Sequence, residues 1–231
     1  MSERTQAQRR NTPAAPARTP AAGREPGRRD AQATREALIG AATAEFARNG
    51  FAGARVDAIA AAAGVNKQLV YYHYDHKDGL YQAVLESVYA ALREKERALS
   101  LEALPPAQAM ERLVGFSFDY LCEHPEFISL LTDENRLRGQ HVAQSQPVRQ
   151  MHMPLVQMIE GTLRRGVAAG VFRPDYDAVN LYISIAGLSY FYFSNRHTLS
   201  AIFGKRLDAR AAQAARRRHV IAFTLNALRA P

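Results

Sequence analysis

Residues 55–74 read RVDAIAAAAGVNKQLVYYHY, and this stretch decides the fold of the chain. It holds two short helical segments, 56–63 and one that starts at Asn66 or Lys67 and reaches Tyr74, with Gly64 at the corner between them. Such a turn needs a glycine at the corner and small or apolar residues where the helices meet their neighbours. Those positions are filled by Ile59, Ala60, Val65 and Val70. The pattern predicts a helix-turn-helix, whose second helix enters the major groove of DNA.

The second of these helical segments has an inward and an outward side. Val70 and Tyr74 lie four residues apart and are expected to face inward, which at 100° per residue turns Gln68 and Tyr72 outward. A glutamine can form two hydrogen bonds with the edge of an adenine, while Tyr72 and Leu69 can pack on thymine methyl groups. The outward side is therefore predicted to read bases.

Basic and phenolic side chains around the motif are expected to contact phosphates, which fix the register of a protein on the duplex. Each alone also fits a plain structural role, the lysines as solvated groups and the tyrosines in packing between helices. Taken together at this spacing, they favour DNA binding. The candidate DNA-binding residues are Arg55, Lys67, Gln68, Leu69, Tyr71, Tyr72, His73 and Lys77.

Helical periodicity continues on both sides of the motif. One helix is expected from Ala31 to the stop signal Asn49-Gly50, and another from Asp75, as its N-cap, to about Leu99. No stretch shows the alternation and hairpin turns of β-strands. We predict an all-α protein of about nine helices. The remaining ones follow the break at Leu104-Pro105-Pro106 and are expected around 107–123, after Pro125, and around 147–169, 176–193 and 208–228.

Composition divides the 231 residues into three predicted regions. Residues 1–30 are rich in Arg, Pro and Ala and are expected to form a disordered basic tail, either a DNA-contacting arm or a solubilising segment. Residues 31–92 are expected to form the DNA-binding domain, and 93–231 a larger helical domain. The net charge of +8 and the pI near 9.9 suggest an anionic partner such as nucleic acid.

Several other classes of protein are disfavoured. The single cysteine, Cys122, cannot form an internal disulfide and is expected to be a small buried group, and no signal peptide begins the chain, so a cytoplasmic protein is expected. The uncharged stretch 178–195 contains too many polar residues for a membrane span. No catalytic motif is present, and Cys122 and His124 lack further metal ligands nearby. No metal, cofactor or enzymatic activity is expected.

Residues 35–85 resemble the tetracycline-repressor (TetR) family of transcriptional regulators. The resemblance implies that Gln68, Leu69 and Tyr72 read bases and that Tyr71 and Lys77 bind phosphates. It is carried by Phe46, Asn49-Gly50-Phe51, Ile59-Ala60, Ala63-Gly64-Val65, Tyr71, Lys77 and Leu80.

Two positions depart from the family pattern. Arg55 stands where many members have a threonine that caps the second helix, and Gln68-Leu69 replaces a small residue followed by threonine. The operator sequence therefore cannot be taken over by analogy. The combination GARVDAIA, LVYY and KDGLY is most similar to the RutR-like branch of the family.

The resemblance also implies a body that binds a small effector and forms a homodimer through its last two long helices, 176–193 and 208–228. The aromatic run 190–193 suits a buried contact, and Arg216-Arg217-Arg218 is expected to be a solvated face. Polar groups on apolar helical stretches suggest where the effector binds. The candidate ligand-binding residues are Phe116, Tyr120, Met151, His152, Gln157, Met158, Asn180 and Ser184.

The sequence thus predicts a DNA-binding transcriptional regulator, a homodimeric repressor released from its operator by a small molecule. One alternative is a DNA-binding regulator that acts without an effector. The other is a helical enzyme. The effector-released repressor and the regulator without an effector can be distinguished by whether any small molecule changes the affinity for the operator.

Overall fold

The computed structural model describes the backbone of residues 26–230 and the side chains of residues 31–230. Over these residues the chain is all-α, as predicted, with an isolated antiparallel bridge between Phe172 and Arg229 and no strand. The elements are α1 (Pro26–Gly53), α2 (Val56–Ala62), α3 (Lys67–Tyr74), α4 (Lys77–Arg97), η1 (Leu101–Ala103), α5 (Pro106–Glu123), α6 (Pro125–Arg136), α7 (Gln140–Gln144), α8 (Gln146–Ala168), α9 (Ala178–Ser194), α10 (Arg196–Phe203) and α11 (Arg210–Leu228).

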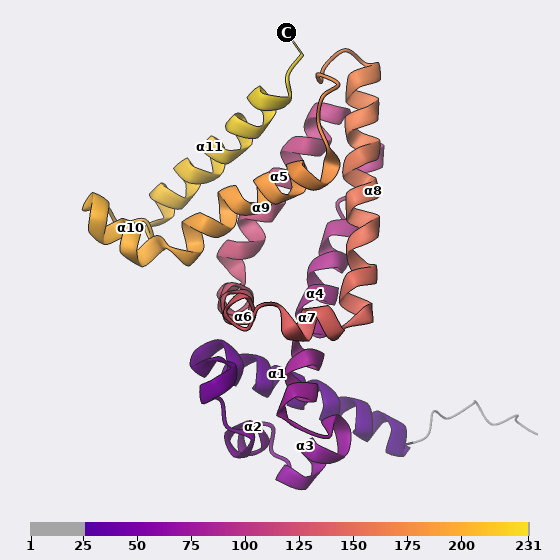
Figure 1. Ribbon diagram of the computed structural model, residues 1–231, viewed down its shortest axis with the longest axis vertical. Coiled ribbons are helices and arrows are strands. Elements are labelled where there is room, and N and C mark those ends of the chain that lie inside the picture. Colours follow the sequence, from indigo (N-terminus) through magenta and orange to yellow (C-terminus); the bar gives the residue numbers. More distant parts are fainter. Residues whose placement is uncertain (1–25, 231) are drawn as a thin grey trace, which may run out of the picture.

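Figure 1 shows two parts stacked along the long axis of the molecule. We call α1 to α3 with the first turns of α4 the head, and the other helices the body. The head is closed by α1, which packs on both α2 and α4 and covers the helix-turn-helix. Its core consists of side chains from all four helices, chiefly Leu38, Phe46, Ile59, Val70, Leu80 and Tyr81.

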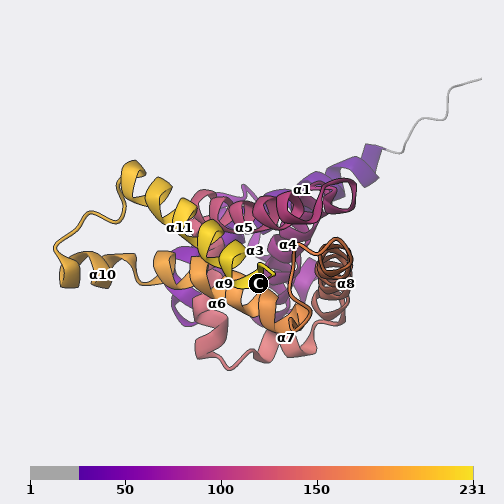
Figure 2. The same ribbon diagram turned by 90° about the horizontal axis from the view of Figure 1, so that it is seen from above.

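The body is built around α5, which packs against α8, α9 and α11. Its core draws on each of these helices and includes Met110, Phe118, Ile159, Ile185 and Val220. Figure 2 shows α10 and the segments on either side of it projecting away from the other helices. The long helix α4 belongs to both parts, because its first turns lie in the head core and its last turns pack against α8.

Two expected helix starts were wrong. The first helix begins at Pro26 rather than Ala31, because proline is well accommodated in the first turn, where its missing N–H has no intrahelical partner. The predicted tail therefore overlaps α1 at residues 26–30, and residues 1–25 lie outside the described part. The expected stop at Gly50 is present as a left-handed kink, φ 66°, after which one further turn reaches Gly53.

The fourth helix begins at Lys77, not at Asp75. Asp75 has a positive φ of 58° and ends α3, so its side chain does not cap α4. His76 is the N-cap instead, and its Nδ1 accepts a hydrogen bond of 3.0 Å from the backbone N–H of Gly79. Asp78 in the first turn favours the positive end of this helix, as expected.

The described residues form eleven α-helices, two more than the approximate count from the sequence. The additional ones are α7 and α10, of five and eight residues. Neither is long enough for its periodicity to stand out from the sequence around it. The left-handed Gly139 immediately before α7 makes the sharp corner between α6 and α7.

Two expectations for surface and core were also wrong. Cys122 is exposed, with Sγ 3.5 Å from Oε1 of Gln213, because the buried stripe of α5 runs through Phe118 and Leu121 beside it. Arg216 and Arg217 are not simply solvated. Arg216 donates to the carbonyl of Leu188, and both groups fasten α11 to the rest of the body, Arg217 through Asp119.

Among the described residues, none of the helices is both long enough and apolar enough to cross a membrane.

Candidate DNA-contacting helix and buried chamber

Helix α3 lies at the end of the molecule far from the body (Figure 1). Asn66 fixes its start, because Oδ1 of this side chain accepts a hydrogen bond of 2.9 Å from the backbone N–H of Gln68. Val70 is buried against the head core, whereas Gln68 is exposed and Tyr72 is 79% exposed. The helix therefore presents the two side chains that the sequence assigned to base reading.

The other predicted side chains of α3 are divided between solvent and neighbouring helices. Leu69 is half-buried and Tyr71 is 41% exposed. Lys67 pairs with Asp57 of α2 at 2.8 Å, and this contact raises the pKa of the lysine and lowers that of the carboxyl. A phosphate contact by Lys67 would therefore compete with Asp57.

His73 faces α1 rather than the outward side of α3. Its Nδ1 accepts a 3.5 Å hydrogen bond from Nε of Arg35, and the ring is half-buried. Arg55 precedes α2 without capping it by its side chain, as expected. The terminal nitrogen of Lys77 lies 3.4 Å from the carbonyl oxygen of Ala52 and 5.1 Å from the centre of the Phe51 ring, so it covers the end of α1.

A small, partly open chamber of about 90 Å³ lies in the body where α4, α5, α6 and α9 meet. Arg93 and Glu96 of α4 are both buried in its wall, with Nη1 and Oε2 2.8 Å apart. Burial raises the pKa of Glu96 to about 7, although Arg93 lowers it. The lining consists of Tyr89, Leu92, Arg93, Glu96, Ser117, Tyr120, Leu121, Phe127, Leu131, Tyr182, Ala186 and Tyr190.

A second cavity, of about 230 Å³, opens on the other side of the same ion pair, between α4 and α8. Met151 and Met158 line it together with Arg93 and Glu96. The charged pair thus borders both cavities.

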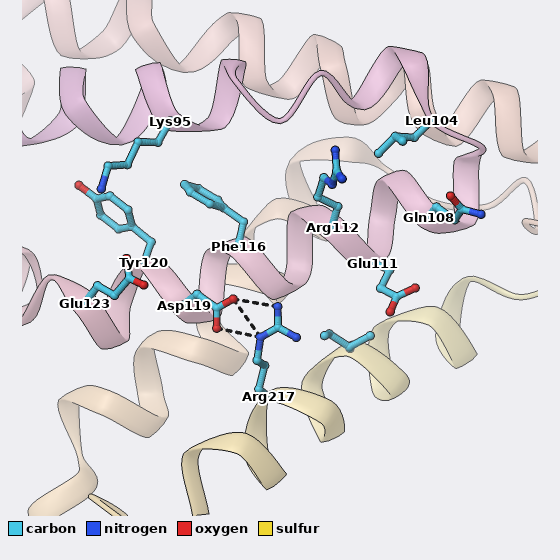
Figure 3. Close-up of a pocket in the computed structure, with 11 residues that line it drawn as sticks. Lys95, Leu104, Gln108, Glu111, Arg112, Phe116, Asp119, Tyr120, Glu123 and Arg217 are labelled. Carbon is cyan, nitrogen blue, oxygen red and sulfur yellow. Dashed lines mark hydrogen bonds and ion pairs between the residues drawn. The ribbon is translucent and has the colours of Figure 1, made fainter. Parts of the chain in front are cut away.

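An outer groove of about 670 Å³ runs between α4, α5 and α11 (Figure 3). Arg217 and Asp119 cross it, joined by hydrogen bonds of 2.8 and 2.9 Å. Tyr120 lines both this groove and the chamber. Lys95 lies 5.4 Å from the centre of the Tyr120 ring, on the groove side.

The structure brings together only some of the predicted ligand residues. Phe116 and Tyr120 line the groove, and Met151 and Met158 line the second cavity. His152 packs edge-on against Tyr89, at 5.2 Å between ring centres, and burial lowers its pKa. Three predicted residues are instead exposed and line neither the chamber nor the two neighbouring cavities, namely Gln157, Asn180 and Ser184.

Sequence reasoning missed the charged pair of the chamber. On α4, Tyr89 and Leu92 continue the buried stripe, and Arg93 and Glu96 follow at helical spacing on the same side. Charged side chains are rarely fully buried unless they are paired. Two opposite charges on the apolar side of a helix were therefore the sequence signal that could have identified this pair.

Head and body meet at a joint formed by α1, α4, α6 and α7. The backbone N–H of Phe51 donates to Oδ2 of Asp133 at 2.5 Å, and the Tyr81 hydroxyl donates to the carbonyl of Leu130 at 3.4 Å. A movement of α6 would therefore act directly on the head.

Three neighbouring helices of the body, α9, α10 and α11, expose large hydrophobic side chains, which together we call the apolar face. The aromatic run 190–193 is divided, because Tyr192 and Phe193 pack on Phe118 while Phe191 is 57% exposed. The apolar face comprises Val179, Ile183 and Phe191 of α9, Ile202 and Phe203 of α10, and Phe223 of α11.

Two family models match this chain. Residues 38–84 match "Bacterial regulatory proteins, tetR family", and residues 106–223 match "Tetracyclin repressor-like, C-terminal domain". The matches cover the helix-turn-helix with its surrounding head, and most of the body.

Known proteins resemble the chain over most of its length. The transcriptional repressor NicS of Pseudomonas putida is 38% identical over 184 residues, covering 80% of this chain and 87% of NicS. The repressor SCO4008 of Streptomyces coelicolor is 36% identical, covering 68% and 79%. A solved structure of the S. coelicolor transcriptional regulator SCO4942 superposes with a TM-score of 0.64 at 27% identity, covering 86% of this chain and 99% of that one.

Proposed function

The chain belongs to the tetR family of bacterial regulatory proteins, and from this premise we propose that it is a homodimeric repressor that a small molecule releases from its DNA operator. It is a DNA-binding transcriptional regulator rather than an enzyme. Its relatives NicS and SCO4008 are both named repressors, which supports the same direction of control here. The RutR-like branch stays a prediction.

The outward face of α3 is the observation that carries the proposal. Gln68 and Tyr72 are the base readers, with Leu69 beside them at the edge of the helix. Tyr71 and Lys77 hold the backbone of the duplex, with Lys67 and Arg55 as further phosphate contacts. His73 serves the head internally, through Arg35. Residues 31–92 then act as the DNA-binding domain and 93–231 as the effector-binding and dimerisation domain.

Helix α4 is the mechanical link between the two functions. Leu80 and Tyr81 near its start are buried in the head core, while Arg93 and Glu96 near its end border the chamber. An effector that prefers one position of α4 shifts the population toward that position. In a dimer this changes the spacing of the two α3 helices, which must match major grooves about 34–36 Å apart. Release from DNA follows without unfolding.

The apolar face supports dimerisation through α9 and α11, with α10 at its margin. Ile183 is 59% exposed and Phe223 55% exposed, although both are large hydrophobic side chains. Large apolar side chains exposed on neighbouring helices favour an interaction surface. In a symmetric dimer the same patch from two copies covers itself, so no other partner is needed.

The test is a footprint and a titration of the purified protein on the DNA that flanks its own gene. Two salt concentrations and a panel of metabolites, including pyrimidines and organic acids, complete the design. We expect protection of a near-palindrome, weakened strongly by salt and abolished by one class of compound. Protection that no compound changes would favour the alternative regulator without an effector. Binding without sequence preference would overturn the proposal.

A further inference from the structure

We propose that the effector is a small monocarboxylate carried on a single ring, and that Arg93 in the chamber binds its carboxylate group. This inference rests on the proposed function, because it names the chemical class of the molecule that releases the operator. It is carried by a buried guanidinium that the protein itself leaves unsatisfied.

Arg93 is 3% exposed, yet its Nε, Nη1 and Nη2 atoms lack hydrogen-bond partners among the described residues. The nearby Oε2 of Glu96, 2.8 Å from Nη1, is an ionic contact whose geometry does not form a hydrogen bond. A guanidinium offers five N–H donors in a planar fork, and buried donors of this kind normally have acceptors. A carboxylate matches the fork with two parallel hydrogen bonds.

Glu96 does not supply these two hydrogen bonds to Arg93. Burial raises the pKa of Glu96 to about 7, so the protonated and the ionised forms are both populated at neutral pH. The protonated form leaves the charge of Arg93 uncompensated and can itself donate a hydrogen bond to an incoming carboxylate. The pair is therefore suited to accept one additional negative charge.

The walls of the chamber set the shape of the rest of the ligand. Tyr89, Tyr120, Tyr182 and Tyr190 line it, with Phe127 beside them. Aromatic side chains pack favourably against a flat ring by stacking or edge contacts. Burial raises the pKa of Tyr89 and Tyr120 to about 12, so their hydroxyls stay protonated and can donate hydrogen bonds.

The size of the chamber excludes large ligands. Its volume is about 90 Å³, whereas an apolar cavity of about 150 Å³ binds benzene. At this volume even a single ring requires the lining side chains to move apart, and a long acyl chain requires a still larger displacement. The outer groove is larger, but its charges balance, because three basic side chains face three carboxylates and Arg217 is already paired with Asp119. It therefore offers an anion no buried, unpaired cation. The charged residues are Lys95, Arg112, Arg217, Glu111, Asp119 and Glu123.

Calorimetric titration of the full-length protein with benzoate tests the inference, with benzamide as the neutral match in size and shape. We expect benzoate to bind and benzamide to bind at least about tenfold more weakly, because it lacks the charge that strengthens hydrogen bonds to a guanidinium. Cyclohexanecarboxylate is expected to bind, while octanoate and inorganic phosphate are not. Equal binding of benzoate and benzamide, or no binding of either ring carboxylate at millimolar concentration, would overturn the inference.

Substitutions locate the site. Arg93→Met is expected to weaken benzoate binding by about 30-fold or more, in the range seen when one member of a buried charged pair is removed. Arg164→Met, at an exposed arginine of α8, is expected to leave it unchanged. Arg93→Lys keeps the charge and loses the fork, so an intermediate loss is expected. Wild-type affinity in folded Arg93→Met would place the ligand elsewhere, and the benzamide comparison holds even if this variant does not fold.

Operator binding separates this inference from the proposed function. If the protein binds its operator and only neutral or long-chain compounds release it, the effector class is wrong and the repressor role stands. If benzoate binds at Arg93 but the protein shows no operator preference, the repressor role fails and the carboxylate site stands. Joint support requires release of the operator by benzoate in the wild type and not in Arg93→Met.

Discussion

His141 and Glu134 form a buried pair at the joint between head and body, with Nδ1 of the histidine 2.9 Å from Oε2 of the glutamate. The other carboxylate oxygen accepts the backbone N–H groups of His141 and Val142 at 2.8 and 3.0 Å. The imidazole in turn lies against the head, 5.0 Å from Phe51 and 4.8 Å from Tyr81 between ring centres. One carboxylate thus holds the start of α7 and a histidine that touches the head.

Removal of this carboxylate is predicted to destabilise the protein. Glu134→Ala leaves several buried donors without an acceptor, and we expect a loss of about 3 kcal/mol in the free energy of unfolding. Urea denaturation followed by circular dichroism measures it. Glu160→Ala, at an exposed glutamate of α8, is the control and should change stability by less than about 0.5 kcal/mol. Equal effects of the two substitutions would contradict the role given to Glu134.

Gln68 is predicted to determine sequence preference. Gln68→Ala should weaken the free energy of operator binding by about 1–3 kcal/mol, through the loss of discrimination at a single base position, and should change binding to random DNA little. Binding measurements on operators with each base pair changed in turn check this. Gln157→Ala, on the body, is the matched control, because Gln157 is also exposed but lies on α8. Equal losses on operator and random DNA would mean that Gln68 does not read a base.

Lys77 is predicted to act on all DNA sequences alike. Lys77→Ala should weaken binding to the operator and to random DNA to the same degree, and should reduce the magnitude of the slope of log affinity against log salt by about 1. Tyr71→Phe should also weaken binding to both kinds of DNA, but without the change in salt slope, because no charge is lost. Because Lys77 also covers Phe51, the melting temperature of each variant should be measured alongside. A loss confined to the operator would argue against phosphate binding.

The apolar face is predicted to hold the dimer. Ile183→Glu introduces a charge among these side chains and is expected to give a monomer in sedimentation equilibrium. Operator affinity should then fall, because a monomer binds only one half-site at a time. Met153→Glu is the matched control, since Met153 on α8 is 58% exposed and Ile183 is 59% exposed. If Ile183→Glu remains a dimer, the interface must lie elsewhere on the body.

Glu96 is predicted to make stability depend on pH. Its pKa is about 7 in the folded protein and 4.5 as the ordinary value, so the folded state retains a proton that the unfolded state has lost between these limits. The stability due to this site is complete below about pH 4.5 and falls as the pH rises to 7, by an amount on the order of 3 kcal/mol. The titratable groups that line the same two cavities are Tyr89, Arg93, Arg97, Glu102, Tyr120, Tyr182 and Tyr190.

Glu96→Gln mimics the protonated form at all pH values. This variant should match the wild type near pH 4.5 and exceed its stability at pH 8, as measured by urea unfolding across the range. Glu94→Gln, at the exposed neighbour on the same helix, should keep the wild-type slope. Parallel curves for Glu96→Gln and the wild type would show that Glu96 ionises normally.

Local signals were sufficient for the helix-turn-helix. Gly64 at the corner, Asn66 before α3 and Val70 on its inner side act within a few residues of each other, so their pattern can be read along the chain. The same holds for the direction of Gln68 and Tyr72, because a helix fixes the angle between neighbouring side chains. The sequence was therefore sufficient to predict which side chains of α3 face the bases.

The effector site required contacts between distant segments. Asn180 and Ser184 are polar groups on an apolar helix, which made them candidates, but α9 turns that side outward beside Val179 and Ile183. Its opposite side supplies Tyr182, which lines the chamber with the centre of its ring 5.9 Å from Cζ of Arg93. Which side of a nearly uniformly apolar helix faces inward depends on its neighbours, because its own pattern is the same all round.

The sequence by itself determined the all-α class, the helix-turn-helix and the family, since these depend on periodicity, turn residues and a motif contained within about fifty residues. Only the tertiary structure decided that Arg93 and Glu96 are buried together, that Cys122 is exposed, and that Glu134 joins His141 at the head. Burial is a property of packing between segments far apart in the chain. Its electrostatic consequences, a shifted pKa and an unsatisfied guanidinium, exist only once those segments have excluded water.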